Sequence, residues 1–171
     1  GPPVTYVTTT TLPAASGGDP IAYCVAGPVS FASAQTVTNT ATATTGGASA
    51  SDSSVLTVLA NPTISNAFTV SDLASGGSTN LTITIGNTNA VAITLTSLLT
   101  DTLPTGMTIH TGGSTGTCTG VTAVGGAGSF TMANGTSLPA GGCTIVVNVT
   151  SSTAGAAQNT IAAGALQTTA G

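Results

Sequence analysis

The stretch that decides the fold is Leu81-Thr82-Ile83-Thr84-Ile85, in which apolar and polar side chains alternate. Because successive side chains of a β-strand point to opposite faces, this alternation predicts a strand with one buried face and one solvated face. Val91-Ala92-Ile93-Thr94-Leu95-Thr96 alternates in the same way, and the run from Cys143 to Val149 is also strand-like. Turn sequences such as Leu103-Pro104-Thr105-Gly106 separate these runs. Strands at this spacing predict an all-β sandwich.

The composition argues against helices. The 23 Gly and 8 Pro residues interrupt the chain every few positions, and no stretch repeats apolar residues with a period of 3.6. We therefore expect essentially no α-helix. Aromatic residues make up 3% of the chain, so the core is expected to consist of Val, Ile, Leu and Ala. Further strands are expected at residues 4–10, 21–25, 36–42, 55–59, 64–70, 107–110, 121–124, 129–132 and 159–166.

The charge pattern excludes several classes of function. The chain contains no Lys and no Arg, and its net charge at pH 7 is −4. A typical globular domain has charged residues at about a quarter of its positions. Because there is no guanidinium or ammonium group to bind phosphate, we expect no nucleic-acid partner and no binding to anionic membranes. No apolar run approaches the ~18 residues that would indicate a membrane span.

An internal repeat suggests how the chain is divided. Cys24 and Cys143 lie about 120 residues apart, as do Asn39 and Asn159, and similar residues surround each pair; about 120 residues is close to the size of one Ig-type domain. Residues 1–60 then correspond to the second half of one domain. Residues 61–171 form a near-complete domain, and the counterpart of the strand that ends at Leu59 is expected to be missing from it.

Several motifs of the second region resemble the Thr-rich, Ig-like repeat domains that are strung in tandem through large bacterial cell-surface proteins. The resemblance covers about residues 62–171, with 20–60 as a trailing half-domain. It implies an Ig-like β-sandwich in an extracellular stalk, adhesin or sheath, and it implies no chemistry. The motifs are Pro62-Thr63-Ile64-Ser65-Asn66-Ala67-Phe68, Gly77-Ser78-Thr79-Asn80-Leu81, Asp101-Thr102-Leu103-Pro104-Thr105-Gly106-Met107, Cys118-Thr119-Gly120 and Leu138-Pro139-Ala140-Gly141-Gly142-Cys143-Thr144.

The three cysteines predict one disulfide and one odd residue. Cys118 and Cys143 are expected to form a bridge, because no metal or catalytic partner competes for them; the alternative is two free thiols in the core. Cys24 occupies the position of Cys143 in the repeat. It has three alternatives: a partner upstream in a longer chain, a partner in another subunit, or a buried free thiol.

No residue pattern indicates catalysis or a cofactor. His110 is the only histidine, there is no Gly-x-Ser-x-Gly motif, and we expect a solvent-facing side chain at the end of a strand. Four aspartates occur singly, which argues against a metal site, and Asp72 and Asp101 are expected in turns. The other two are Asp19 and Asp52. The protein is therefore not expected to be an enzyme.

Glycans are a modification that the sequence permits. Asn80, Asn134 and Asn148 each begin an Asn-x-Thr triplet, which is the pattern for N-glycosylation. Such triplets are frequent by chance in a Thr-rich chain. Glycans on exposed Thr or Ser are an equal alternative.

The expected function is structural: a subunit of an extracellular bacterial filament, sheath or adhesin stalk, at the cell surface. The alternative is an adhesin module that binds a glycan or a partner protein, although carbohydrate sites usually present aromatic platforms and few aromatics are present here.

The missing strand predicts how copies would assemble. A sandwich that lacks a strand exposes a sheet edge, and such edges recruit strands from other chains. We expect a head-to-tail homopolymer in which the N-terminal segment or the half-domain from Ile21 to Leu59 inserts into the next subunit. The donor residues in the N-terminal segment are Val4, Tyr6, Val7 and Leu12. In the rival interpretation, the chain is an excerpt of a longer tandem array.

Overall fold

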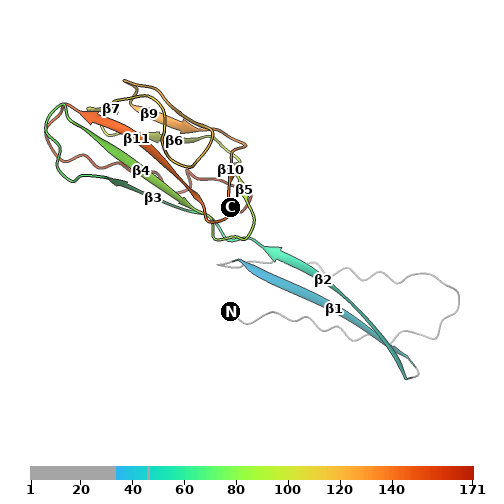
Figure 1. Cartoon of the computed structure of the whole chain (residues 1–171). Helices are drawn as coiled ribbons and strands as arrows, with labels where there is room; N and C mark the ends of the chain where they lie inside the picture. The colour runs from blue at the N-terminus through green and yellow to red at the C-terminus, as the bar shows by residue number, and fades with distance from the viewer. Residues whose placement is uncertain (1–33, 46) are drawn as a thin grey trace. The chain divides into compact units, whose positions relative to one another are not determined.

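The computed structural model describes residues 34–45 and 47–171 (Figure 1). The expected donor residues Val4, Tyr6, Val7 and Leu12, together with Cys24 and Asp19, lie outside this part of the chain. The chain divides into two units, Gly1–Leu59 and Ala60–Gly171. The described residues form strands and turns, and none of them belongs to a helix. In this part of the chain there is accordingly no helix that could cross a membrane.

The first unit contains a long β-hairpin. Strand β1 (Gln35–Thr45) pairs antiparallel with β2 (Ala48–Val58), from Gln35↔Val58 to Thr45↔Ala48 (Figure 1). Gly47, at the turn, has a φ of 90°, which glycine adopts without steric cost. Strand β2 begins before the expected run at 55–59, because its first residues, mostly Ser and Ala, continue the ladder with the Thr-rich end of β1.

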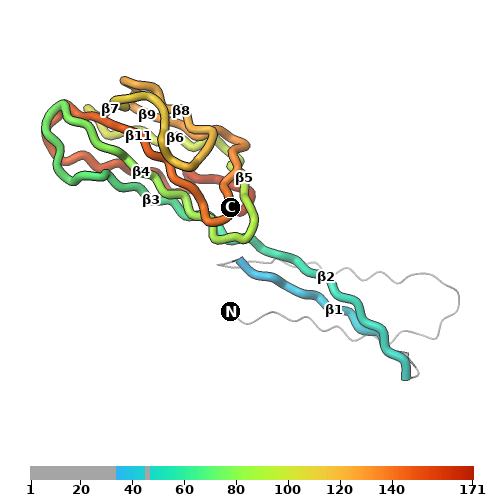
Figure 2. Tube along the Cα trace, viewed as in Figure 1, coloured from blue at the N-terminus to red at the C-terminus, as the bar shows by residue number. Residues whose placement is uncertain are grey.

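The second unit is an all-β sandwich. Its larger sheet has the order β3-β4-β11-β7, where β3 is Thr63–Phe68, β4 is Ser78–Gly86, β7 is Met107–Ile109 and β11 is Cys143–Ser151. Strands β4 and β11 lie side by side in the middle of this sheet (Figure 2). Leu81, Ile83 and Ile85 are fully buried, as the alternation predicts, and alternate residues of β11 pack in the same core.

The opposite layer contains a sheet of order β6-β9-β8 and a short pair. Its strands are β6 (Leu99–Thr102), β8 (Val121–Ala123) and β9 (Ser129–Met132); the pair is β5 (Ile93–Thr94) with β10 (Ser137–Leu138). Leu99, Phe130 and Met132 complete the core from this side. Burial is therefore carried mainly by aliphatic side chains, with a single buried aromatic ring among the described residues.

Two runs that the sequence predicts as strands have a different conformation in the structure. The run at 91–96 is a strand only at β5, after which Leu95 forms an isolated bridge with Thr168. The run at 159–166 is not a strand. It contains a turn in which the amide of Ala165 donates to the carbonyl of Ala162, and Gly164 has a φ of 79°. Because Ala and Gly have low strand propensity, the Ala162-Ala163-Gly164-Ala165 sequence interrupts the run.

Candidate functional site

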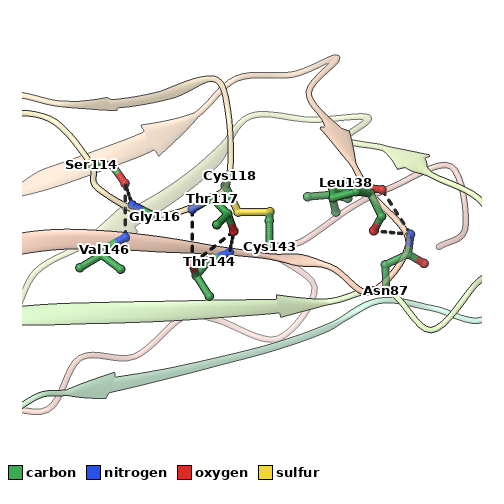
Figure 3. Close-up of a disulfide and its surroundings, with 10 residues drawn as sticks. Asn87, Ser114, Gly116, Thr117, Cys118, Leu138, Cys143, Thr144 and Val146 are labelled. Carbon is green, nitrogen blue, oxygen red and sulfur yellow. Dashed lines mark hydrogen bonds between the residues drawn. A yellow bond between two sulfur atoms is a disulfide. The ribbon is translucent and has the colours of Figure 1, made fainter.

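The predicted disulfide is present. Cys143 begins β11, Cys118 lies in the loop between β7 and β8, and their Cα atoms are 5.0 Å apart (Figure 3). The amide of Cys118 donates to the carbonyl of Thr144 (2.9 Å), and the amide of Thr144 donates to Oγ1 of Thr117 (2.9 Å). The bridge and these hydrogen bonds fix the loop along one edge of β11.

The same loop covers that edge of β11 further along the strand. The amide of Thr115 donates to the carbonyl of Val146 (3.0 Å), and Oγ of Ser114 accepts from the amide of Val146 (3.3 Å). His110 lies just past the end of β7, and its backbone amide donates to the carbonyl of Asn148. Its side chain is exposed, as predicted. A further strand therefore cannot add at this edge.

Three other strands lie at the edge of a sheet. Within residues 34–45 and 47–171, β3 pairs only with β4, and β6 and β8 pair only with β9. The edge of β8 is partly used, because the carbonyl of Ala123 accepts from the amide of Gly113. No backbone hydrogen bond from the described residues reaches the outer side of Leu99–Thr102. Unpaired edges of this kind present N–H and C=O groups that template the addition of another strand.

The β1–β2 hairpin has two chemically different faces, because residues that are directly opposite in an antiparallel ladder share a face. One face, called here the apolar face, has Val37 opposite Leu56 and Ala43 opposite Ala50. The same face also carries polar residues, namely Gln35, Asn39, Ser54 and, opposite Ala41, Asp52. The other face carries Thr and Ser apart from Val55. Each face has one well-exposed apolar side chain, Leu56 at 54% and Val55 at 61%, whereas Val37 is half-buried. The hairpin thus presents an amphipathic ribbon to solvent.

A buried polar pair lies on the inner side of β6. Asp101 and Asn159 are 2% and 5% exposed, and Nδ2 of Asn159 donates to Oδ2 of Asp101 (2.8 Å). Burial raises the pKa of the Asp101 carboxyl, although the hydrogen bond from Asn159 opposes this shift. The expectation that Asp101 lies in a turn is wrong. Its partner is 58 residues away in the sequence, so the local pattern contains no signal for the pair.

A second buried polar cluster holds one end of the sandwich. Nδ2 of Asn87 donates to the carbonyls of Val91 (3.0 Å), Leu138 (3.2 Å) and Pro139 (3.1 Å). Oδ1 of Asn87 accepts from Nδ2 of Asn89 (2.8 Å), which also donates to the carbonyl of Ala60 (2.9 Å). Figure 3 shows Asn87 beside Leu138. From the sequence these asparagines indicate only a turn, whereas in the structure they satisfy buried backbone groups.

The three Asn-x-Thr triplets lie in different environments. Asn80 and Asn148 are opposite each other on β4 and β11, and Nδ2 of Asn148 donates to Oδ1 of Asn80 (2.9 Å). Asn134 is exposed between β9 and β10. A glycan on Asn148 would break the amide pair, so Asn134 is the more accessible position. Glycosylation stays a prediction.

One hollow of the sandwich has no reactive lining. It has a volume of about 360 Å³ and is lined by Phe68, Val70, Leu73 and Met107 together with Ser, Thr, Ala and Gly residues. No titratable side chain lines it. The described residues also contain no cluster of three or more His, Cys, Asp or Glu that would suit a metal ion. The features with distinctive chemistry are therefore the hairpin, the open edges and the two buried polar clusters.

Fold and features together define a disulfide-bonded all-β sandwich preceded by a β-hairpin. Residues 62–171 match the model of a family described as a domain of unknown function, DUF7933. The chain belongs to this family, and the match spans nearly the whole sandwich unit. No curated protein matches the chain, and no solved structure does.

Proposed function

We propose that the protein is a structural subunit of an extracellular filament, sheath or stalk, and that copies assemble head-to-tail by β-strand complementation. The observation that carries the proposal is the exposed apolar face of the β1–β2 hairpin. The partner of this face is a second copy of the chain, whose β6 edge accepts the hairpin.

The energetics of the hairpin support this assignment. A two-stranded hairpin is marginally stable in water unless it packs against something else. Burying one Leu or Val side chain contributes about 1.5–3 kcal/mol, so cover over Val37 and Leu56 would stabilise the hairpin substantially. Addition to an open edge would also pair backbone groups of β6 that have no partner among the described residues.

The internal repeat relates one residue of the hairpin to a residue that lies beside β6. Asn39 lies on the apolar face, opposite Ser54, and it corresponds to Asn159 in the repeat. Asn159 is buried beside β6, where it donates to Asp101. Because Asn159 already occupies this place in each copy, the choice of β6 as acceptor rests on its open edge and not on Asn39.

Two further properties support an extracellular structural role. The Cys118–Cys143 bridge is typical of oxidising compartments outside the cytosol. A chain without Lys or Arg also has few groups that would bind nucleic acids or anionic metabolites. Both properties suit a scaffold that is chemically inert.

The proposal is tested by two neighbouring substitutions on opposite faces of β2. Leu56→Asp places a charge on the apolar face, whereas Val55→Asp places the same charge at a similarly exposed position on the Thr/Ser face. We expect Leu56→Asp to prevent assembly, as measured by light scattering and sedimentation, and Val55→Asp to assemble like the original chain. Equal behaviour of the two variants would contradict the proposed role of the apolar face.

Deletion of residues 1–12 shows whether the N-terminal segment or the hairpin is the donor. This variant removes Val4, Tyr6, Val7 and Leu12 but keeps the hairpin. If the hairpin is the donor, the truncated chain still assembles. Soluble subunits that no longer assemble would instead identify the N-terminal segment as the donor.

A further inference from the structure

The buried carboxyl of Asp101 has no cation to balance it. The chain contains no Lys and no Arg, and the strands of the sandwich contain no other titratable side chain apart from the disulfide-bonded Cys143. The other titratable side chains of this unit, Asp72 and His110, are exposed. An ionised carboxylate that is buried without a charged partner is strongly destabilising, and such a group usually takes up a proton instead.

Two buried oxygens of the Asp101–Asn159 pair lack a hydrogen bond, and one added proton on the carboxyl would allow them to bond to each other. Nδ2 of Asn159 already donates to Oδ2 of Asp101. The remaining oxygens, Oδ1 of Asp101 and Oδ1 of Asn159, are both buried and have no hydrogen-bond partner among the residues that the structure describes. Two acceptors cannot bond to each other, but a protonated carboxyl is a donor as well as an acceptor. A proton on Oδ1 of Asp101 would let that atom donate to Oδ1 of Asn159.

The pair also connects residues 154–166 to strand β6. From Ala154 to Leu166 the hydrogen bond between Asn159 and Asp101 is the only described one that reaches another part of the chain. The segment is otherwise fixed at its two ends: Oγ of Ser75 donates to the carbonyl of Ser152, and the amide of Thr96 donates to the carbonyl of Gln167.

We propose that Asp101 is held as a neutral carboxylic acid that pairs through two hydrogen bonds with the amide of Asn159, and that this pair is a pH-sensitive latch for residues 154–166. The latch lies within one sandwich and does not depend on the proposed assembly. Raising the pH removes the proton, leaves a buried carboxylate facing an amide oxygen, and weakens the attachment of the segment.

The direction of the pH effect follows from the raised pKa of Asp101. A carboxyl that binds its proton more tightly in the folded state stabilises the fold fully below the unfolded pKa of about 3.9, and this contribution is lost as the pH rises through the folded pKa. The sign is opposite to that of an aspartate in a salt bridge, which loses stability in acid.

The first experiment follows the proton directly. In the ¹³C-labelled full chain, NMR measures the chemical shift of the Asp101 side-chain carboxyl carbon as a function of pH, with Asp72 as the exposed reference. We expect the midpoint for Asp101 to lie above the ordinary value of about 3.9 and above that of Asp72. A midpoint at or below that of Asp72 would overturn the proposal, and this measurement needs no variant that might fail to fold.

The second experiment compares urea unfolding from about pH 4 to about pH 8 for the original chain, Asp101→Asn and Asp72→Asn. The original chain and Asp72→Asn are expected to shift toward lower urea midpoints as the pH rises, whereas Asp101→Asn should show a smaller shift. Asn159→Ala should speed hydrogen exchange of the Ala165 amide, which donates to the carbonyl of Ala162, and Asn134→Ala should not. An unchanged pH shift in Asp101→Asn would contradict the latch.

Discussion

At the scale of single residues, close backbone approach decides which positions tolerate a side chain. Gly142 has a φ of 85°, and a Cβ atom there would collide with the carbonyl oxygen of Ile85 in the neighbouring strand. Both the backbone conformation and the clash involve main-chain atoms, so neither is relieved by a rotamer change. The junction between the Pro139 turn and β11 therefore depends on glycine at this position.

We predict that Gly142→Ala lowers the free energy of unfolding by about 3 kcal/mol. Gly128→Ala is the control, because Gly128 has no positive φ and a Cβ there meets nothing within 4 Å. The control should change stability by less than about 0.5 kcal/mol. Urea unfolding followed by circular dichroism measures both, and a Gly142→Ala variant as stable as the control would show that β11 can shift.

The sequence predicts which apolar residues are buried, but it does not predict which polar residues are. The burial of Leu81, Ile83 and Ile85 follows from local alternation, and the structure confirms it. The position of Asp101 does not follow, because burial of a polar side chain depends on a partner that the fold brings from far along the chain. The donor and acceptor pattern of Asn87 was missed for the same reason.

At the scale of elements, β11 is held by β4 on one side, and by β7 together with a disulfide-anchored loop on the other. The bridge closes a loop of 25 residues, and constraint of an unfolded loop of this size contributes roughly 3 kcal/mol in the chain-entropy picture. The hydrogen bonds of Thr117 to Thr144 lie beside the bridge and depend on the loop staying in place.

We predict that the double variant Cys118→Ala/Cys143→Ala loses about 3 kcal/mol of stability but keeps its strands. Cys24→Ala leaves the bridge intact and is the control. The measurement is urea unfolding, combined with non-reducing peptide mapping of the original chain. Finding Cys118 and Cys143 both open to alkylation in the native protein would contradict the pairing.

Element boundaries could be predicted only where the local pattern is strong. The cores of β4 and β11 agree with the expected runs, because their alternation spans several residues. Strand β6 was not expected, since Leu99-Thr100-Asp101-Thr102 alternates only if Asp101 counts as a buried residue. The run at 159–166 fails because its Ala and Gly residues form a turn.

At the scale of the whole molecule, stability rests on apolar burial, sheet hydrogen bonds and one disulfide. Without Lys or Arg the chain forms no ordinary salt bridge. The all-β class could be predicted because alternation and turn residues recur along most of the sequence, whereas partners outside the chain leave no comparable local pattern.

We predict that the urea-unfolding free energy changes by less than about 1 kcal/mol between low and high NaCl concentrations, since there are few charges to screen. Circular dichroism of the same samples should show strand and no substantial helix. A sharp fall in stability with added salt would mean that electrostatic attraction contributes to the fold after all.

The most direct test of the central claim is an electron cryo-microscopy structure of the protein at concentrations where it assembles. The account predicts head-to-tail filaments in which the apolar face of the β1–β2 hairpin is buried and the hairpin of one copy forms backbone hydrogen bonds with β6 of the next. Particles that stay monomeric, or filaments in which Leu56 remains exposed to solvent, would contradict it.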